Sequence, residues 1–171
     1  MIMLIYIIVF AVVLHFLFYL LQPERDKHRI YQKKARKILK DIQSKERPDG
    51  QIINYLRTIN PYVFEELVLS AFEKSGYTIK RNKRYSGDGG IDGRMSRDGT
   101  KYLIQCKRYR WNIHQSDVEE FDELCEKKKT KGFFVHTGKT GDGARQAAQW
   151  SDNVTIISGS KLVRLLKGEN A

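Results

Sequence analysis

Apolar and polar positions divide the chain into an apolar segment, a strongly charged segment and a longer stretch of regular periodicity. Residues 1–22 contain no formally charged side chain. A helix rising about 1.5 Å per residue would extend roughly 33 Å over this segment, enough to cross a ~30 Å hydrocarbon core. A cleaved signal peptide is the alternative, but the segment lacks a basic start and a small-residue cleavage site. We therefore interpret residues 1–22 as a transmembrane anchor.

Residues 23–50 are rich in Lys and Arg and follow the apolar segment directly. The positive-inside rule then places the C-terminal side in the cytoplasm, which predicts a single-pass protein of the inner (cytoplasmic) membrane. A thin apolar stripe predicts a juxtamembrane helix up to about Gln43, and the Arg47–Gly50 segment reads as a break and linker. The basic side chains of this helix suit either DNA or anionic lipid headgroups.

From Gln51 to Ala171 the pattern predicts one folded domain of helices and short strands. Asn60 and Pro61 form a helix start, and apolar residues at helical spacing continue to Gly76. Further helices are predicted from Ser116, Gly143 and Ser160, and strands at residues 77–80, 91–95, 101–107, 133–135 and 154–157. This order predicts an α/β protein with a three-layer α/β/α sandwich and a mixed central sheet.

Candidate chemistry gathers around a predicted hairpin. Side chains two apart on a strand share a face, so Gln105 and Lys107 point together while Cys106 points the other way. A turn at residues 97–99 brings Asp92, which closes a glycine-rich segment, back alongside this pair. A carboxylate, an amide oxygen and a lysine in one place can hold a divalent cation beside a phosphate.

Several spaced motifs carry a resemblance to a known family. These are NPYVFEELVLSAFEKSGY, GDGGID, YLIQCKRY and KGFFVHTGKT, in that order. The sequence resembles the Mrr-like restriction endonucleases of the PD-(D/E)xK nuclease superfamily, in the variant with an Asp…Gln-x-Lys core. The resemblance extends over roughly Pro61 to Leu166. It implies a restriction-endonuclease-like fold and metal-dependent hydrolysis of DNA phosphodiester bonds.

The predicted site combines these motifs. Asp92 would anchor a metal ion, with the Gln105 side-chain oxygen and the backbone carbonyl of Cys106 as further ligands. Lys107 would orient or deprotonate water and offset charge in the transition state. The resemblance implies that Glu65, on the first helix of the domain, completes the catalytic site and binds the metal directly or through water.

Two expectations follow from this site. We expect Mg²⁺ as cofactor, with Mn²⁺ as a substitute, and weak binding because Gln105 carries one charge fewer than the Glu that many members of the superfamily have. The neighbour of Glu65 on its helix, Glu66, is expected to be a charge facing solvent.

The formal net charge of +11 and the pI near 9.6 favour a polyanionic partner. Two cysteines indicate neither a disulfide framework nor a structural zinc site, and they fit a reduced compartment. The basic residues expected to contact DNA flank the site along the chain and are Lys80, Arg81, Lys83, Arg84, Arg108 and Arg110.

We therefore predict a membrane-anchored, Mg²⁺-dependent DNA endonuclease of the restriction type or acting on DNA structure. The alternative is a membrane-tethered nucleic-acid-binding module with a degenerate nuclease site, and a second is a membrane protein whose basic segment holds lipid. The partners expected are DNA and, through the N-terminal helix, a membrane. Cutting both strands usually requires two active sites, so a homodimer is a further expectation.

Overall fold

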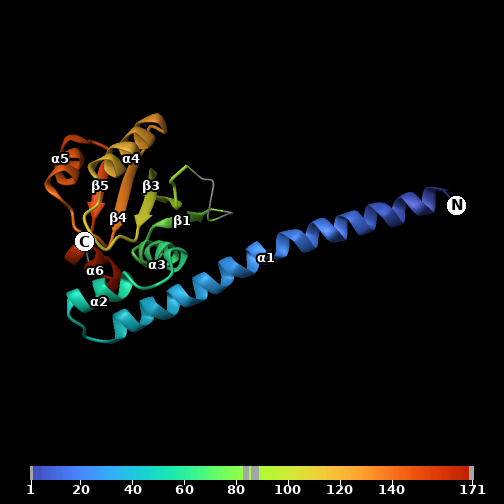
Figure 1. Cartoon of the computed structure of the whole chain (residues 1–171), viewed down its shortest axis with the longest axis horizontal. Coiled ribbons are helices and arrows are strands. Elements are labelled where there is room, and N and C mark those ends of the chain that lie inside the picture. The colour runs from blue at the N-terminus through green and yellow to red at the C-terminus, as the bar shows by residue number, and fades with distance from the viewer. Residues whose placement is uncertain (1, 83–84, 86–88, 170–171) are drawn as a thin grey trace.

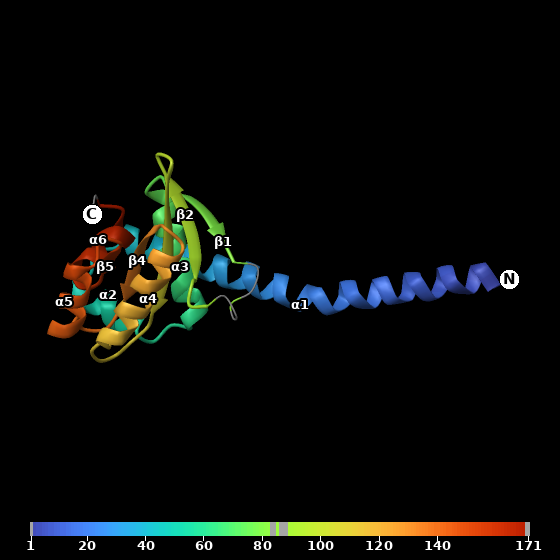
Figure 2. The same cartoon turned by 90° about the horizontal axis from the view of Figure 1, so that it is seen from above.

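The computed structural model describes residues 2–82, 85 and 89–169. Its helices are α1 (Ile2–Ser44), α2 (Asp49–Leu56), α3 (Pro61–Lys74), α4 (Gln115–Lys127), α5 (Asp142–Trp150) and α6 (Gly159–Lys167) (Figure 1). Its strands are β1 (Thr78–Arg81), β2 (Gly93–Arg97), β3 (Thr100–Lys107), β4 (Lys131–His136) and β5 (Val154–Ile157) (Figure 2).

The five strands form one sheet in the order β1-β2-β3-β4-β5. The pairs β1–β2 and β2–β3 are antiparallel, whereas β3–β4 and β4–β5 are parallel, so the sheet is mixed as predicted. Asp98 and Gly99 connect β2 to β3 and both have positive φ, which is the requirement of a tight hairpin turn. The parallel strands are joined by α4 and α5, because a parallel pair needs a crossover connection.

Helices cover both faces of the sheet (Figure 1). One buried cluster joins α1, α2, α3 and α6 to one face, and a second joins α4 and α5 to the other. Alternation along β3 supplies both clusters, since Ile104 and Cys106 belong to the first and Leu103 to the second. The domain therefore has the three layers that the sequence predicts.

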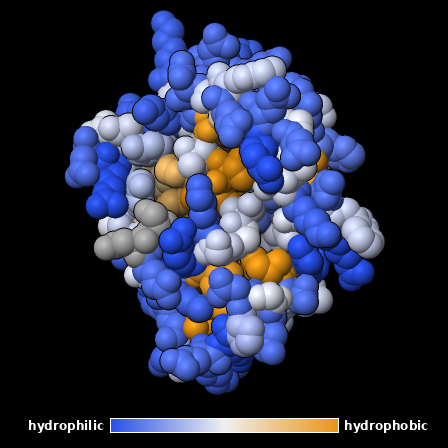
Figure 3. Space-filling model, turned by 90° about the vertical axis from the view of Figure 1, so that its left-hand side faces the viewer, coloured by the Kyte–Doolittle hydropathy of each residue, from blue (hydrophilic) through white to orange (hydrophobic). Residues whose placement is uncertain are grey.

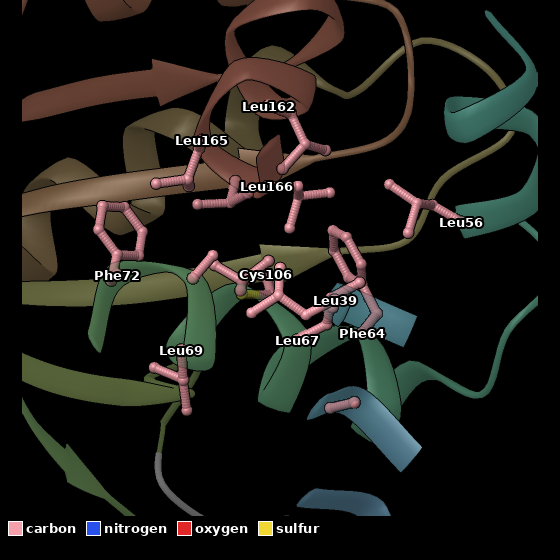
Figure 4. Close-up of a cluster of buried hydrophobic side chains, with 14 of the residues drawn as sticks. Leu39, Leu56, Phe64, Leu67, Leu69, Phe72, Cys106, Leu162, Leu165 and Leu166 are labelled. Carbon is pink, nitrogen blue, oxygen red and sulfur yellow. The ribbon is translucent and has the colours of Figure 1, made fainter. Parts of the chain in front are cut away.

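The C-terminal half of α1 is part of this core. Ala35, Leu39 and Ile42 are buried at helical spacing and face the cluster around α3. Figure 4 shows Leu39 among the side chains of this cluster, together with Phe64 and Cys106. The segment interpreted as a juxtamembrane helix thus packs on the domain, which the sequence placed from Gln51 onward.

The prediction of a transmembrane anchor is wrong. In the part of the chain that the structure describes, no helix has a segment both long enough and apolar enough to cross a membrane. The apolar residues at the start of the chain form no separate element, because α1 continues from Ile2 to Ser44 into the Lys- and Arg-rich segment. The N-terminal part of this helix extends away from the other elements (Figures 1 and 2).

Hydrophilic side chains cover most of the domain face that lies opposite the N-terminal end of α1, and a few apolar groups lie between them (Figure 3). This distribution matches the composition, because 30% of the residues are charged. The largest fully buried side chains, among them Phe64, Phe121 and Phe134, lie in the two clusters instead. Burial of these apolar groups is the main stabilising term of the fold.

Truncation of Leu39 tests whether α1 belongs to the domain. Leu39 is 1% exposed, so Leu39→Ala should lower the free energy of unfolding by about 2–5 kcal/mol through lost burial and a cavity. Ile30, on the same helix, is half exposed, and Ile30→Ala should change it by less than about 0.5 kcal/mol. Urea unfolding of both variants measures this, and equal stability of the two would show that α1 does not pack as described.

Candidate active site

The β2–β3 hairpin places Asp92 beside the part of β3 that carries Gln105. Gly93 pairs with Ile104, and the Asp92 amide donates to the Ile104 carbonyl at 2.8 Å. Asp92, the residue before Gly93, therefore lies beside Ile104, the neighbour of Gln105 on β3. The predicted approach of Asp92 to this part of β3 is thus a consequence of the hairpin pairing.

The carboxylate of Asp92 is held by the main chain of β3. Its Oδ2 accepts a hydrogen bond of 2.6 Å from the Cys106 amide. Burial raises the pKa of the Cys106 thiol well above its ordinary value, and the charges of Asp92 and Glu65 add to this. The thiol stays neutral and belongs to the core, as the sequence predicts, so Cys106 presents its main chain to the site.

The side chain of Gln105 ends in a buried amide whose hydrogen bonding is incomplete. The residue is 9% exposed, and its Oε1 atom has no hydrogen-bond partner among the described residues. Gly90 packs against the same amide, because a Cβ added at Gly90 would lie 2.7 Å from Gln105 Nε2. Gly90 also has φ of 83°, so glycine is required there on both grounds. A buried carbonyl oxygen without a donor is free to bind a cation.

Glu65 approaches this group from α3. Desolvation by burial, together with the smaller effects of the negative charges of Asp92 and Glu66, raises its pKa to about 8. The effect of Asp92 shows that the two carboxylates are close enough to repel each other. Without a cation, Glu65 is therefore mostly protonated at neutral pH.

Lys107 is held by a residue that the sequence analysis did not select. Its Nζ lies 3.8 Å from Oδ1 of Asp117, which also accepts a hydrogen bond of 3.3 Å from the Tyr109 hydroxyl. The other Asp117 oxygen accepts from the His114 amide at 3.2 Å and so caps α4, which begins at Gln115, one residue before the start predicted at Ser116. The sequence did contain a signal for Asp117, because it is an acidic residue in the first turn of the helix that follows the strand with Gln105 and Lys107.

The structure corrects the expectation for Glu66. This residue is 1% exposed and does not face solvent. Its carboxylate accepts a 2.9 Å hydrogen bond from Arg81, which also binds Glu73 at 3.0 Å. Arg81, selected as a DNA contact, is therefore engaged in ion pairs that compensate a buried charge.

The remaining residues selected for DNA contact divide into three groups. Lys80 and Arg110 are exposed. Arg108 is partly buried and donates to the backbone carbonyl of Arg57. Lys83 and Arg84 lie outside the described residues. Lys80 and Arg110 thus retain the exposure that a phosphate contact requires.

The sequence of the chain is similar to those of known restriction endonucleases. Residues 56–166 match the model of the Mrr_cat family, which is described as a restriction endonuclease. The chain belongs to this family. It is 29% identical over 124 residues to the type IV methyl-directed restriction enzyme EcoKMrr of Escherichia coli strain K12. The alignment covers 68% of this chain and 41% of that enzyme, so the chain spans about two fifths of the length of its relative.

Restriction endonuclease domains of this superfamily generally use divalent metal ions, and the residues here can be compared with that requirement. Within residues 2–82, 85 and 89–169, no three His, Cys, Asp or Glu side chains are placed to hold a metal ion. The residues predicted to hold the ion are two carboxylates, Asp92 and Glu65, and the amide oxygen of Gln105. All are hard oxygen donors of the kind that Mg²⁺ and Mn²⁺ bind. The unpartnered Gln105 Oε1 fits such a site.

The raised pKa of Glu65 predicts a pH dependence of stability in the presence of EDTA. The folded protein retains a proton up to about pH 8, whereas the unfolded chain releases it near the ordinary value of 4.5. The folded state then binds more protons, so its stability falls as the pH rises through this window. Glu65→Gln removes the titrating group.

Relative to wild type, Glu65→Gln should be about equally stable near pH 4 and more stable by at least about 1 kcal/mol near pH 8. Urea unfolding at several pH values measures the difference. The variant Glu119→Gln, at an exposed position of α4, is the control and should show no such trend. A difference between Glu65→Gln and wild type that is constant over the range would contradict the assignment.

Proposed function

We propose that this protein is a Mg²⁺-dependent endonuclease that hydrolyses DNA phosphodiester bonds. The observation that carries the proposal is the geometry of the β2–β3 hairpin, which sets the Asp92 carboxylate against the Cys106 amide, between Gln105 and Lys107 in the sequence of β3. Glu65 adds a second carboxylate from α3. Membership of the Mrr_cat family supports the same reaction class.

Each residue has a part in this reaction. A bound divalent ion supplies Lewis-acid stabilisation of the phosphate and lowers the pKa of a bound water. Asp92, oriented by the Cys106 amide, and Gln105 would hold that ion through oxygen atoms. Lys107 is one third exposed and lies near Asp117, so its ammonium is oriented and can still reach a phosphate in solvent. Its positive charge would offset charge that develops in the transition state.

Metal binding should be weak and coupled to protons. Gln105 is neutral, so the site has one charge fewer than a site with an acidic residue there. Glu65 must lose its proton to bind a cation, and its pKa of about 8 means that this release opposes binding at neutral pH. We therefore propose that millimolar Mg²⁺ is needed and that Mn²⁺ substitutes for it.

The substrate class follows from charge and family. The net charge of +11, together with exposed Lys80 and Arg110 near the ends of β1 and β3, favours DNA phosphates as the partner. The Escherichia coli relative is named as a methyl-directed restriction enzyme. The alignment covers only 41% of that enzyme. We therefore propose for the present chain the same class of reaction, restriction-type or structure-dependent DNA cleavage, and do not propose that it recognises methylated DNA.

Plasmid cleavage tests the proposal. Wild-type protein should nick or linearise plasmid DNA with Mg²⁺ or Mn²⁺ and not with EDTA. Asp92→Asn and Lys107→Ala should each reduce the rate by about 100-fold or more, the size of effect measured when one group that stabilises a transition state is removed. Asp98→Asn in the hairpin turn and Lys101→Ala on β3 are matched controls at exposed positions and should cut like wild type.

Modified and branched DNA extend the test if unmodified plasmid is not cut. Binding of all these substrates without cleavage would contradict the proposal and favour a nucleic-acid-binding module with a degenerate site. Cleavage that persists in Asp92→Asn would place the reaction elsewhere.

A further inference from the structure

A buried carboxylate beside the candidate site collects donors from three separate segments. Glu66 on α3 is 1% exposed and accepts hydrogen bonds from Arg81 of β1 at 2.9 Å and from the Tyr85 hydroxyl at 3.0 Å. From α1, Gln32 donates to it at 3.5 Å, and Nδ1 of His28 lies 3.9 Å away. A buried carboxylate requires such partners, so these segments are tied to one point.

Aromatic contacts hold the ring of Tyr85. It stacks on His28 of α1 with a centroid separation of 4.0 Å and an interplanar angle of 17°. Tyr62 and Tyr31 lie 4.6 and 5.4 Å from it between centroids. Burial raises the pKa of Tyr85, and the Glu66 charge adds to this, so the hydroxyl stays protonated and continues to donate. Tyr85 is therefore held by its ring and by its hydroxyl.

Tyr85 lies in the connection from β1 to Asp92. The two ends of this connection are joined by Asn82, whose Nδ2 donates to the Ile91 carbonyl while its Oδ1 accepts from Arg94 at 2.9 Å. Ile91 immediately precedes Asp92. Asn82 therefore restrains the backbone next to the candidate metal ligand, and Tyr85 is held within the same connection.

Glu66 and Glu65 are adjacent on α3 but have different surroundings. Successive residues on a helix point about 100° apart, so α3 can direct Glu65 toward Asp92 and Glu66 toward α1. The charge of Glu66 is paired with Arg81, whereas the pKa of Glu65 is raised to about 8. Glu66 thus has hydrogen-bond partners of its own and acts on Glu65 through its charge.

We propose that Glu66 is a positioning residue that holds Tyr85 against α1 and thereby sets the position of Asp92. The inference rests on the proposed function, because it assigns the network to the nuclease site. It makes α1, which lies outside the family match at residues 56–166, part of the scaffold of that site. Partners that orient metal ligands from outside the coordination sphere typically change affinity or activity by about 10–100-fold when they are removed.

Variants of the full chain separate the two contacts of Tyr85. Tyr85→Phe removes the hydrogen bond to Glu66 and keeps the ring, while His28→Ala removes the stacking partner. Each should weaken Mn²⁺ binding and plasmid cleavage by about tenfold or more. His28→Phe restores a stacking ring and should recover most of both. Isothermal titration with Mn²⁺ reads the site without turnover, and DNA binding in EDTA should be unchanged.

Two controls show that the effect is local. Tyr102→Phe removes a hydroxyl from a tyrosine near the other end of β3, within a separate group of aromatic rings, and should behave as wild type. Ile30→Ala changes an exposed residue of α1 near His28 and should do the same. Thermal melting of every variant identifies loss of folding, and if His28→Ala is unfolded, Tyr85→Phe decides the matter alone.

The outcomes distinguish this inference from the function on which it rests. If wild type binds Mn²⁺ and cuts DNA, and Tyr85→Phe equals it in both, the positioning role is refuted while the nuclease stands. If wild type neither binds Mn²⁺ nor cuts any DNA, the proposed function fails, and the positioning role fails with it for want of a metal site. Weaker Mn²⁺ binding and slower cleavage in Tyr85→Phe and His28→Ala, with recovery of both in His28→Phe, support the positioning role.

Discussion

The hydrogen bond from the Cys106 amide to the Asp92 carboxylate is the contact on which the candidate site depends. It joins the residue before β2 to the end of β3, the two places where the chain carries its chemistry. At 2.6 Å it is a short hydrogen bond between a main-chain amide and a carboxylate. Because the donor is main chain, the backbone of β3 holds the Asp92 carboxylate directly, and Gln105 and Lys107 lie on the same strand.

Electrostatics then divide the acidic residues around this bond. Glu66 is buried and paired with Arg81, which compensates its charge. Glu65 lies close to Asp92, and burial with repulsion raises its pKa to about 8. Asp92 and Glu65, next to a carbonyl oxygen without a donor at Gln105, form a place where a divalent cation would favour the ionised form of Glu65 and accept the Gln105 oxygen as a ligand. In our proposal, binding of such a cation enables the site of this Mrr_cat domain to hydrolyse DNA.

The sequence predicted those parts of the structure that local rules determine. The Asp-Gly turn and the two-residue alternation of a strand were enough to bring Asp92 alongside the strand that carries Gln105. These local rules could not show that Glu66 is buried. Burial of a helix residue depends on the elements that pack against it, and the partner Arg81 lies fifteen residues away along the chain. The apolar segment at the start of the chain was also misread, since composition does not show that α1 continues unbroken to Ser44.

An anomalous diffraction map from crystals grown with Mn²⁺ tests the central claim most directly. The account predicts one or more peaks beside Asp92, with oxygen atoms of Asp92 and Gln105 at about 2.0–2.3 Å and Glu65 bound directly or through water. Such peaks should vanish in Asp92→Asn. Ordered density for these side chains with no anomalous peak beside them, at a Mn²⁺ concentration that supports DNA cleavage, would contradict the account.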